Sequence, residues 1–257
     1  SALYHYLEKE GHTAVGWDRQ KVPLDNYEQM FEFLQTEQPD VLYHLAIASQ
    51  PSGRDNEGWL VNYQWPSELA WLTKELGIKF IFTSTVMVYT NNATAPFTPD
   101  TVPDETEGYG ADKLRAERRV QEQNPAAIIV RLGWQIGTKA GSNNMIDFLE
   151  KQMAEHGRIE ASTKWYPACS FLADTAAVLT QLATADSGLY LLNSNTRWTF
   201  YEIVTTLNEQ RGRPWQVIPT ENFVYDQRML DERLNTPPLN THLQILPAKK
   251  PADYSGV

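Results

Sequence analysis

Two stretches, Phe80-Ile81-Phe82-Thr83-Ser84-Thr85 and Tyr109-Gly110-Ala111-Asp112-Lys113, carry the pattern that decides the fold. The first begins as an apolar run typical of a strand covered on both faces. The second places Tyr109 and Lys113 four residues apart, so on a helix the phenol and the ammonium share one face. A nearby ammonium favours the phenolate, so we expect the pKa of Tyr109 to fall from about 10 toward neutrality, which would make this hydroxyl a usable proton donor and acceptor. Solvated helix faces also show this spacing, so the rest of the chain decides its meaning.

Strand and helix patterns alternate on both sides of these stretches. Pro66 either kinks one predicted helix or starts a new first turn, and Gly77 ends it. Strands that alternate with helices of about 10 to 20 residues form parallel sheets with right-handed crossovers. The sequence therefore predicts an α/β fold with a doubly wound, Rossmann-like parallel sheet. Predicted helices cover residues 2–11, 27–35, 58–76 and 109–123, and predicted strands cover 13–17, 41–46, 78–83 and 126–132.

Beyond Gly137 the alternation loosens. Apolar periodicity predicts helices over 145–157, 174–182 and 199–212, a strand over 188–192, and then a loop-rich tail with many prolines. Thr199 and Glu202 form a capping-box pattern at the start of the last helix. We therefore expect a dinucleotide-binding domain over residues 1–137 and a smaller substrate-binding lobe over residues 138–257, with parts of 166–192 packing back on the first domain.

The composition argues against several classes of partner. The chain of 257 residues has a formal net charge of -10 and a pI near 5.0, which disfavours nucleic acid and anionic membranes because both bind basic surfaces. No apolar run approaches the roughly 20 residues of a membrane span. Cys169 is the only cysteine, so an internal disulfide is excluded and a reducing compartment such as the cytoplasm is favoured. The five histidines are not spaced as metal ligands, and we predict no metal site.

Asp18 and Arg19 follow the predicted strand 13–17. In a dinucleotide fold, an acidic residue at the end of the second strand holds the adenosine ribose, whereas an arginine there can accept a 2′-phosphate. Because both residue types are present, NAD and NADP both stay open as cofactors.

Further motifs occur in an order and spacing that match a known family: His44-Leu45-Ala46, Asn62, residues 80–89, Tyr109 with Lys113, residues 131–134, Gly188-Leu189-Tyr190, Trp198-Thr199 and residues 233–236. Together they resemble the extended short-chain dehydrogenase/reductase superfamily, within it the dTDP-4-dehydrorhamnose reductase-like and NAD-dependent epimerase branch. The resemblance covers nearly the whole chain and implies catalytic roles for Thr85, Tyr109 and Lys113. It implies cofactor binding by Asp18, Arg19, Leu45, Ala46, Ile47, Asn62, Thr83, Tyr109, Lys113 and Leu132, and substrate binding by Val86, Met87, Trp134 and Arg233.

The sequence departs from this family in two places. The glycine-rich phosphate loop and the first strand are absent from the sequence, and without that strand its neighbours would bury unpaired backbone groups. We therefore expect residues upstream of Ser1 in the native protein. After Thr85, rhamnose reductases usually have Asp and the 4,6-dehydratases an Asp-Glu pair, but Val86 and Met87 stand here. This argues against dehydratase chemistry and weakens the specific rhamnose assignment.

The resemblance implies a reductase that uses NAD or NADP on a keto sugar nucleotide or a similar carbonyl. A sugar-nucleotide epimerase with the same residues and a non-catalytic NAD(P)-binding regulatory subunit stay open as alternatives. The implied partner is a small molecule, a nucleotide sugar, and the chain could also form a homodimer. Plain structural roles compete for single residues: Trp134 could be core, Asp174 could cap its helix, and surface exposure could account for Arg131, Lys139, Arg197, Arg228 and Arg233.

Overall fold

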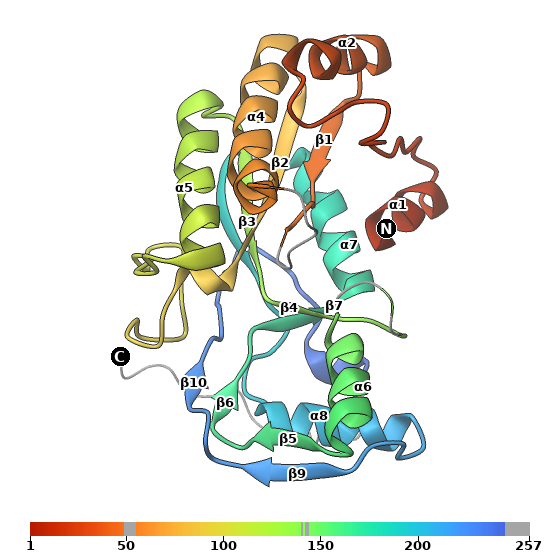
Figure 1. Ribbon diagram of the computed structural model, residues 1–257, viewed down its shortest axis with the longest axis vertical. Helices are drawn as coiled ribbons and strands as arrows, with labels where there is room; N and C mark the ends of the chain where they lie inside the picture. Colours follow the sequence, from red (N-terminus) through yellow and green to blue (C-terminus); the bar gives the residue numbers. More distant parts are fainter. Residues whose placement is uncertain (49–54, 140, 142–143, 245–257) are drawn as a thin grey trace. The chain divides into compact units, whose positions relative to one another are not determined.

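The computed structural model describes residues 1–48, 55–139, 141 and 144–244. Contacts divide the chain into two compact units, each drawn from segments that are far apart in the sequence (Figure 1). The first unit consists of Ser1–Ala93, Val102–Arg131 and Ala176–Tyr190. The second consists of Thr94–Thr101, Leu132–Thr175 and the described part of Leu191–Val257.

Among the described residues, a four-stranded sheet organises the first unit. Its strands are β1 (Val41–His44), β2 (Lys79–Thr85), β3 (Ile128–Leu132) and β8 (Gly188–Leu192), in that spatial order. β1 and β2 run parallel. Residues 80–85 of β2 are all buried, as predicted for a strand covered on both faces. The predicted α/β fold with a parallel central sheet is confirmed.

Helices α4 (Trp65–Leu76) and α5 (Gly108–Gln123) lie side by side along this sheet (Figure 1). Their apolar faces form one core with the strands. The predicted helix at the N-terminus is α1 (Ala2–Lys9), and the next is α2 (Tyr27–Glu37). The core cluster of this unit includes Leu34, Leu69, Leu72, Phe80, Phe82, Val120 and Ile129.

The helix predicted over residues 58–76 is divided into three pieces. It begins as α3 (Glu57–Trp59), continues as a π-helical turn over Leu60–Gln64, and becomes α4 with Pro66 in its first turn. Proline fits there because the first helical positions have no backbone partner for their N–H groups. Gly77 ends α4 with a φ of 69°, the left-handed conformation that glycine adopts without a steric cost.

The strand predicted over residues 13–17 is wrong, since these described residues form no strand. A strand needs a neighbour for its hydrogen bonds, and among the described strands β1 at this edge pairs with β2 alone. Side-chain contacts anchor the segment instead. Trp17 donates from Nε1 to Val22 O at 2.9 Å, and its ring packs edge-on against Phe33 and Trp65.

The described part of the second unit contains short parallel strand pairs and two longer helices. The predicted helix over 145–157 is α6 (Met145–His156), and Gly157 ends it. The capping box predicted from Thr199 and Glu202 starts α8 (Phe200–Gln210). The strand pairs are β4 (Trp134–Ile136) with β7 (Cys169–Phe171), β5 (Ile159–Ser162) with β9 (Val217–Thr220), and β6 (Trp165–Tyr166) with β10 (Tyr225–Asp226).

The tail that the sequence predicts to be loop-rich also contains two short strands, β9 and β10, which the sequence analysis did not identify. These strands have 4 and 2 residues, and Pro219 interrupts the pattern of β9, so alternation cannot reveal them. The remaining helix, α7 (Leu172–Gln181), covers most of the helix predicted over 174–182. No helix in the described part of the chain is both long enough and apolar enough to cross a membrane.

Candidate active site

β2 ends at Thr85, and the chain then makes a 3-10 turn over Val86–Val88. Thr85 is buried, and its Oγ1 accepts a hydrogen bond from Met87 N at 3.2 Å, which fixes the start of this turn. Thr83, two residues earlier, donates from Oγ1 to His44 O at 3.0 Å and ties β2 to β1. A threonine hydroxyl that accepts one bond still has its proton to donate, so the hydrogen-bonding role predicted for Thr85 is chemically available.

The first turn of α5 lies directly against the turn that follows Thr85. Gly110 makes this approach possible: a Cβ atom at residue 110 would overlap the carbonyl oxygen of Met87 and lie 2.9 Å from Glu105 Cγ. Close approach of one backbone to another is a common reason for glycine inside a helix. Tyr109 is the neighbour of Gly110 in the same turn, so the Tyr109 and Thr85 segments are packed together.

Lys113 lies one helical turn beyond Tyr109 and is 0% exposed. Its Nζ is 4.1 Å from the centre of the Phe82 ring and has no hydrogen-bond acceptor among the described residues. Burial lowers the pKa of Lys113 to about 7, although the nearby Glu117 carboxylate opposes the change. The amine is therefore close to the point at which it gains or loses its proton at neutral pH.

The expected fall in the pKa of Tyr109 is wrong. Burial raises the pKa of Tyr109 to about 12 because the phenolate loses its hydration. The charge of Lys113 does not offset this shift. In the described structure Tyr109 is a protonated phenol at neutral pH.

More buried polar atoms without a partner among the described residues lie on β1 and β2: both ring nitrogens of His44 and Ser84 Oγ. The His44 ring packs against Trp65, with ring centres 4.7 Å apart, and against Phe82 at 5.6 Å. Burial, and then the charge of Lys113, lower the pKa of His44 well below its usual value, so it is neutral. Buried polar atoms are normally hydrogen-bonded, so such a group points to a ligand or water.

Asn62 holds the segment that follows β1. It is buried on the π-helical turn, its Oδ1 accepts from Ala48 N at 3.0 Å, and its Nδ2 donates to Ala48 O at 2.9 Å. The predicted cofactor residues Leu45, Ala46 and Ile47 lie in this segment, and Ile47 is exposed. Asn62 therefore acts on them through the backbone of Ala48. π-helical turns are frequent at functional sites, which agrees with this position.

Asp18 and Arg19 differ in how far their side chains are already engaged. Asp18 Oδ1 accepts from Gln20 N at 2.9 Å, and Oδ2 lies 3.9 Å from Lys21 Nζ. The Arg19 guanidinium is 5.6 Å from the centre of the Trp65 ring, and its side chain is 47% exposed. Both side chains are about half exposed, but the carboxylate supports its own turn, whereas the guanidinium is held on an aromatic surface.

The residues predicted to bind substrate lie in both units. In the first unit Val86 is buried and Met87 is 51% exposed. In the second unit, to which Leu132 also belongs, Trp134 stacks on Trp165 and Phe200 with ring centres 5.9 Å apart in each case. The Arg233 fork donates to both carboxylate oxygens of Asp231, which also accepts from Leu191 N.

The sequence analysis missed the role of Arg131. The surface position that it allowed for this residue is wrong, because the side chain is buried. It is 3% exposed and donates two hydrogen bonds to Glu117, at 2.9 and 2.6 Å, and one to Tyr89 OH at 2.5 Å. No short-range pattern links a strand residue to a helix residue 14 positions away.

The Asp174 carboxylate, which the sequence offered as a helix cap, pairs with His242 Nε2 at 2.9 Å.

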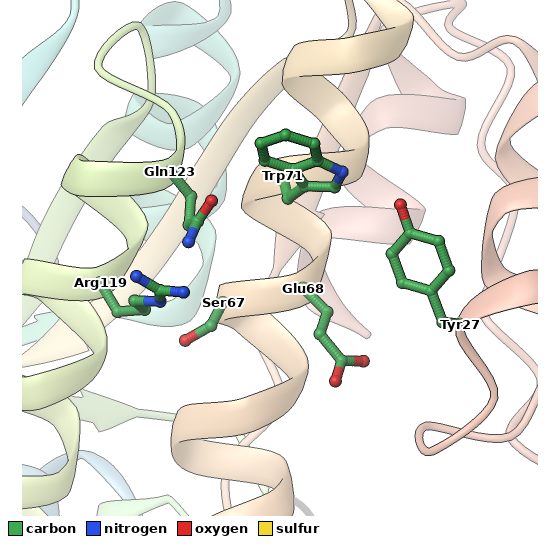
Figure 2. Close-up of a pocket in the computed structure, with 6 residues that line it drawn as sticks. All are labelled: Tyr27, Ser67, Glu68, Trp71, Arg119 and Gln123. Atoms are coloured by element: carbon green, nitrogen blue, oxygen red, sulfur yellow. The ribbon is translucent and has the colours of Figure 1, made fainter.

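A separate hollow of about 310 Å³ lies on the outer surface of the first unit and contains none of the predicted site residues. Figure 2 shows its lining on α2, α4 and α5, with the Trp71 ring and the Arg119 guanidinium prominent in it. The hollow is lined by Tyr27, Ser67, Glu68, Trp71, Arg119 and Gln123.

In the described part of the chain, no three His, Cys, Asp or Glu side chains are grouped so that they could hold a metal ion.

The fold and the packed Tyr109, Lys113 and Thr85 segments define a Rossmann-like α/β protein with polar side chains where its central strands end. The chain belongs to the family described as RmlD substrate binding domain, whose model matches residues 1–228. The branch that the motifs resemble, that of the dTDP-4-dehydrorhamnose reductases and their epimerase-like neighbours, is thereby confirmed.

Two curated relatives are distant in sequence. The chain is 24% identical over 161 residues to the "Probable low-salt glycan biosynthesis reductase Agl14" of Haloferax volcanii, a match that covers 58% of this chain and 54% of that protein, about half its length. It is 19% identical over 229 residues to the spore coat polysaccharide biosynthesis protein SpsK of Bacillus subtilis, covering 88% of this chain and 80% of that protein.

Solved structures of similar fold extend over nearly the whole chain. A dTDP-4-dehydrorhamnose reductase from Bacillus anthracis in complex with NADP has a TM-score of 0.80 at 18% identity, covering 94% of this chain and 91% of that one. The enzyme WbmH of Bordetella bronchiseptica in complex with NAD+ has a TM-score of 0.77 at 16% identity, with the same coverage of 94% and 91%. At these identities the similarity establishes the fold.

Proposed function

We propose that this protein is a nicotinamide-dependent oxidoreductase that reduces a keto sugar nucleotide or a similar carbonyl compound. One observation carries the proposal: α5 holds Tyr109 and Lys113 four residues apart, and Gly110 between them packs on the backbone that follows Thr85. This brings a proton donor, a buried amine and a second hydroxyl into one region of the first unit. A relative named as a reductase and a fold neighbour named dTDP-4-dehydrorhamnose reductase support the reaction class.

The residues present fit a nicotinamide cofactor, because the Lys113 Nζ, which has no acceptor among the described residues, is suited to the hydroxyls of the nicotinamide ribose. Fold neighbours in complex with NADP or NAD support the same choice. When bound, this cofactor supplies the hydride that reduces the carbonyl carbon. The residues proposed to hold it are Asp18, Arg19, Leu45, Ala46, Ile47, Asn62, Thr83, Tyr109, Lys113 and Leu132.

Tyr109 would donate its phenolic proton to the carbonyl oxygen, and Thr85 would donate a hydrogen bond to the same oxygen. The pKa of about 12 keeps Tyr109 protonated at neutral pH, as a donor must be. Lys113 in its ammonium form would stabilise the phenolate that the transfer leaves behind. For the substrate we propose contacts with Val86, Met87, Trp134 and Arg233, of which Met87 is the most exposed in the first unit.

Replacing Tyr109 with Phe tests the proposal. We expect turnover to fall by a factor of about 100 or more, while binding of the reduced cofactor is retained, because only the donated proton is lost. Turnover is measured as oxidation of NADH or NADPH in the presence of dTDP- and UDP-linked 4-keto sugars, and binding as quenching of tryptophan fluorescence. Tyr27→Phe is the matched control, since Tyr27 is an exposed phenol on α2.

Three results would contradict the proposal, each in a different way. Full turnover by Tyr109→Phe would remove Tyr109 from the chemistry. An isomerised sugar without net cofactor oxidation would indicate an epimerase. No turnover by the wild-type protein with any of these sugars, together with stable capture of a protein partner, would indicate the regulatory subunit.

A further inference from the structure

We infer that Gly110 is a positioning residue for the proposed reaction: its missing side chain sets how closely the turn that carries Tyr109 approaches the turn after Thr85. The inference rests on the proposed function, because it assigns a role to the contact between these turns.

The space beside Gly110 is closed by main-chain atoms. A Cβ atom at this position would overlap Met87 O and lie 2.8 Å from Met87 C and 2.9 Å from Glu105 Cγ. A flexible side chain such as that of Glu105 can rotate away from a new methyl group, but a carbonyl group moves only with its backbone. An alanine at residue 110 must therefore displace either the turn after β2 or the first turn of α5.

The turn after β2 is the more firmly held of the two. Hydrogen bonds fix it at its start, at its end and to the loop that precedes α5. Two of these bonds close the turn on itself and make it stiff, and the third joins it to the loop before α5, so we expect the first turn of α5 to be the part that moves. The bonds are Met87 N to Thr85 Oγ1 at 3.2 Å, Tyr89 N to Val86 O at 3.1 Å and Glu105 N to Val88 O at 3.0 Å.

The rest of α5 is anchored independently of its first turn. Lys113 Nζ packs on the Phe82 ring at 4.1 Å, and Glu117 is locked by Arg131. A displacement at Gly110 therefore moves Tyr109 more than Lys113. We therefore expect a substitution of Gly110 to lower turnover while the contact of Lys113 with the cofactor is kept.

The test is Gly110→Ala in the full chain. We expect turnover to fall on the order of 100-fold, as for a reacting group misplaced by about 1 Å, while the Kd of NADPH or NADH stays within about twofold of wild type. The control is Gly58→Ala on α3, where a Cβ atom would meet no atom of the described residues within 4 Å.

The outcomes separate this inference from the proposed function. An active wild type with an equally active, folded Gly110→Ala variant would overturn the positioning role and leave the proposed function standing, and so would equal losses of turnover and cofactor binding. An inactive wild type would overturn the proposed function and this inference with it.

Circular dichroism checks that Gly110→Ala folds, and a second variant decides the matter if it does not. Glu105→Ala withdraws the other neighbour of Gly110, whose carboxylate accepts from Thr106 N and Glu107 N ahead of α5. It adds no volume, and we expect turnover about tenfold lower with unchanged cofactor binding, since the same turn is loosened. Full turnover in Glu105→Ala, with Gly110→Ala unfolded, would also overturn the inference.

Discussion

The first unit buries two cations, Arg131 and Lys113, and holds them in opposite ways. Arg131 donates to both oxygens of Glu117 and to Tyr89 OH, so each of its three guanidinium nitrogens has an acceptor. Lys113 is equally buried, yet its Nζ faces the Phe82 ring and no acceptor among the described residues. A paired buried charge belongs to the framework, whereas an unpaired one points to a ligand.

Both cations lie within reach of one carboxylate, which makes the contrast sharper. Glu117 follows Lys113 by four residues on α5, a spacing that favours an ion pair, but its oxygens are bound to Arg131. Burial acts to lower the pKa of Arg131, but the hydrogen bonds that Arg131 donates to Glu117 and the Glu117 charge raise it above its usual value; burial lowers the pKa of Lys113 to about 7. The fold therefore satisfies the arginine and leaves the lysine available.

The largest effect should come from breaking the paired cation. Arg131→Met leaves the Glu117 carboxylate buried without its partner, and we expect a loss of about 3–5 kcal/mol in the free energy of unfolding, measured with urea. Replacing both partners, in Glu117→Leu with Arg131→Met, should recover most of this loss because no buried charge is left unpaired. A single variant as stable as wild type would contradict the framework role.

Substituting the other buried cation, Lys113, should have the opposite effect: activity should fall while stability is kept. Lys113→Met takes away an amine that has no acceptor in the described part of the chain, so we expect stability to be retained or increased, while turnover falls by a factor of about 100 and cofactor binding weakens. Urea unfolding, cofactor oxidation and fluorescence quenching measure the three quantities. Lys74→Met, at an exposed position on α4, is the control. A destabilised but fully active variant would reverse the assignment.

The pH dependence of stability should also distinguish Lys113. Because its pKa falls from 10.5 to about 7 on folding, the unfolded chain binds more protons than the folded one between these values. Stability must then rise with pH in this window, by about 2 kcal/mol between pH 7 and pH 9 from this residue. The measurement is the difference between wild type and Lys113→Met in urea unfolding at both pH values. Equal slopes in the two proteins would show that the amine is not buried.

The contrast also separates what the sequence could predict from what it could not. Tyr109, Lys113 and the strand ending in Thr85 lie in short stretches whose periodicity is local, so sequence reasoning finds the elements that carry them. β1, α2 and α8 were found in the same way. The strand predicted at 13–17 failed because pairing depends on a neighbour that local sequence does not reveal.

Burial and long-range partners were beyond the sequence. The sequence alone allowed a surface position for Arg131, because its hydrogen bonds to Glu117 and Tyr89 link positions that are far apart in the chain. The raised pKa of Tyr109 follows from burial, which a spacing of four residues cannot measure. Gly110 was visible within the motif, but its contact with Met87 needed the tertiary structure.

The smallest effect should come from a third cation of the first unit, Arg19, which is neither buried nor fully paired. Its guanidinium rests on Trp65, and its distance of 3.9 Å from Glu57 makes a weak, partly exposed ion pair. Such pairs contribute roughly 0 to 1 kcal/mol, so Arg19→Gln should leave stability nearly unchanged. An effect of Arg19→Gln should therefore appear in cofactor binding and not in the free energy of unfolding.

Because Asp18 accepts a hydrogen bond within its own turn, whereas the Arg19 guanidinium is held on the Trp65 ring with only a weak pair to Glu57, we predict that the protein binds NADPH more tightly than NADH. Arg19→Gln should weaken NADPH binding about tenfold, the size of one charge-assisted contact to a phosphate, and leave NADH binding unchanged. Fluorescence titrations with both nucleotides and with 2′,5′-ADP measure this. Lys21→Gln is the control, as its side chain is 83% exposed. An equal loss for NADH and NADPH would mean that Arg19 binds a part that both cofactors share, and a wild type that prefers NADH would make Asp18 the residue that recognises the ribose.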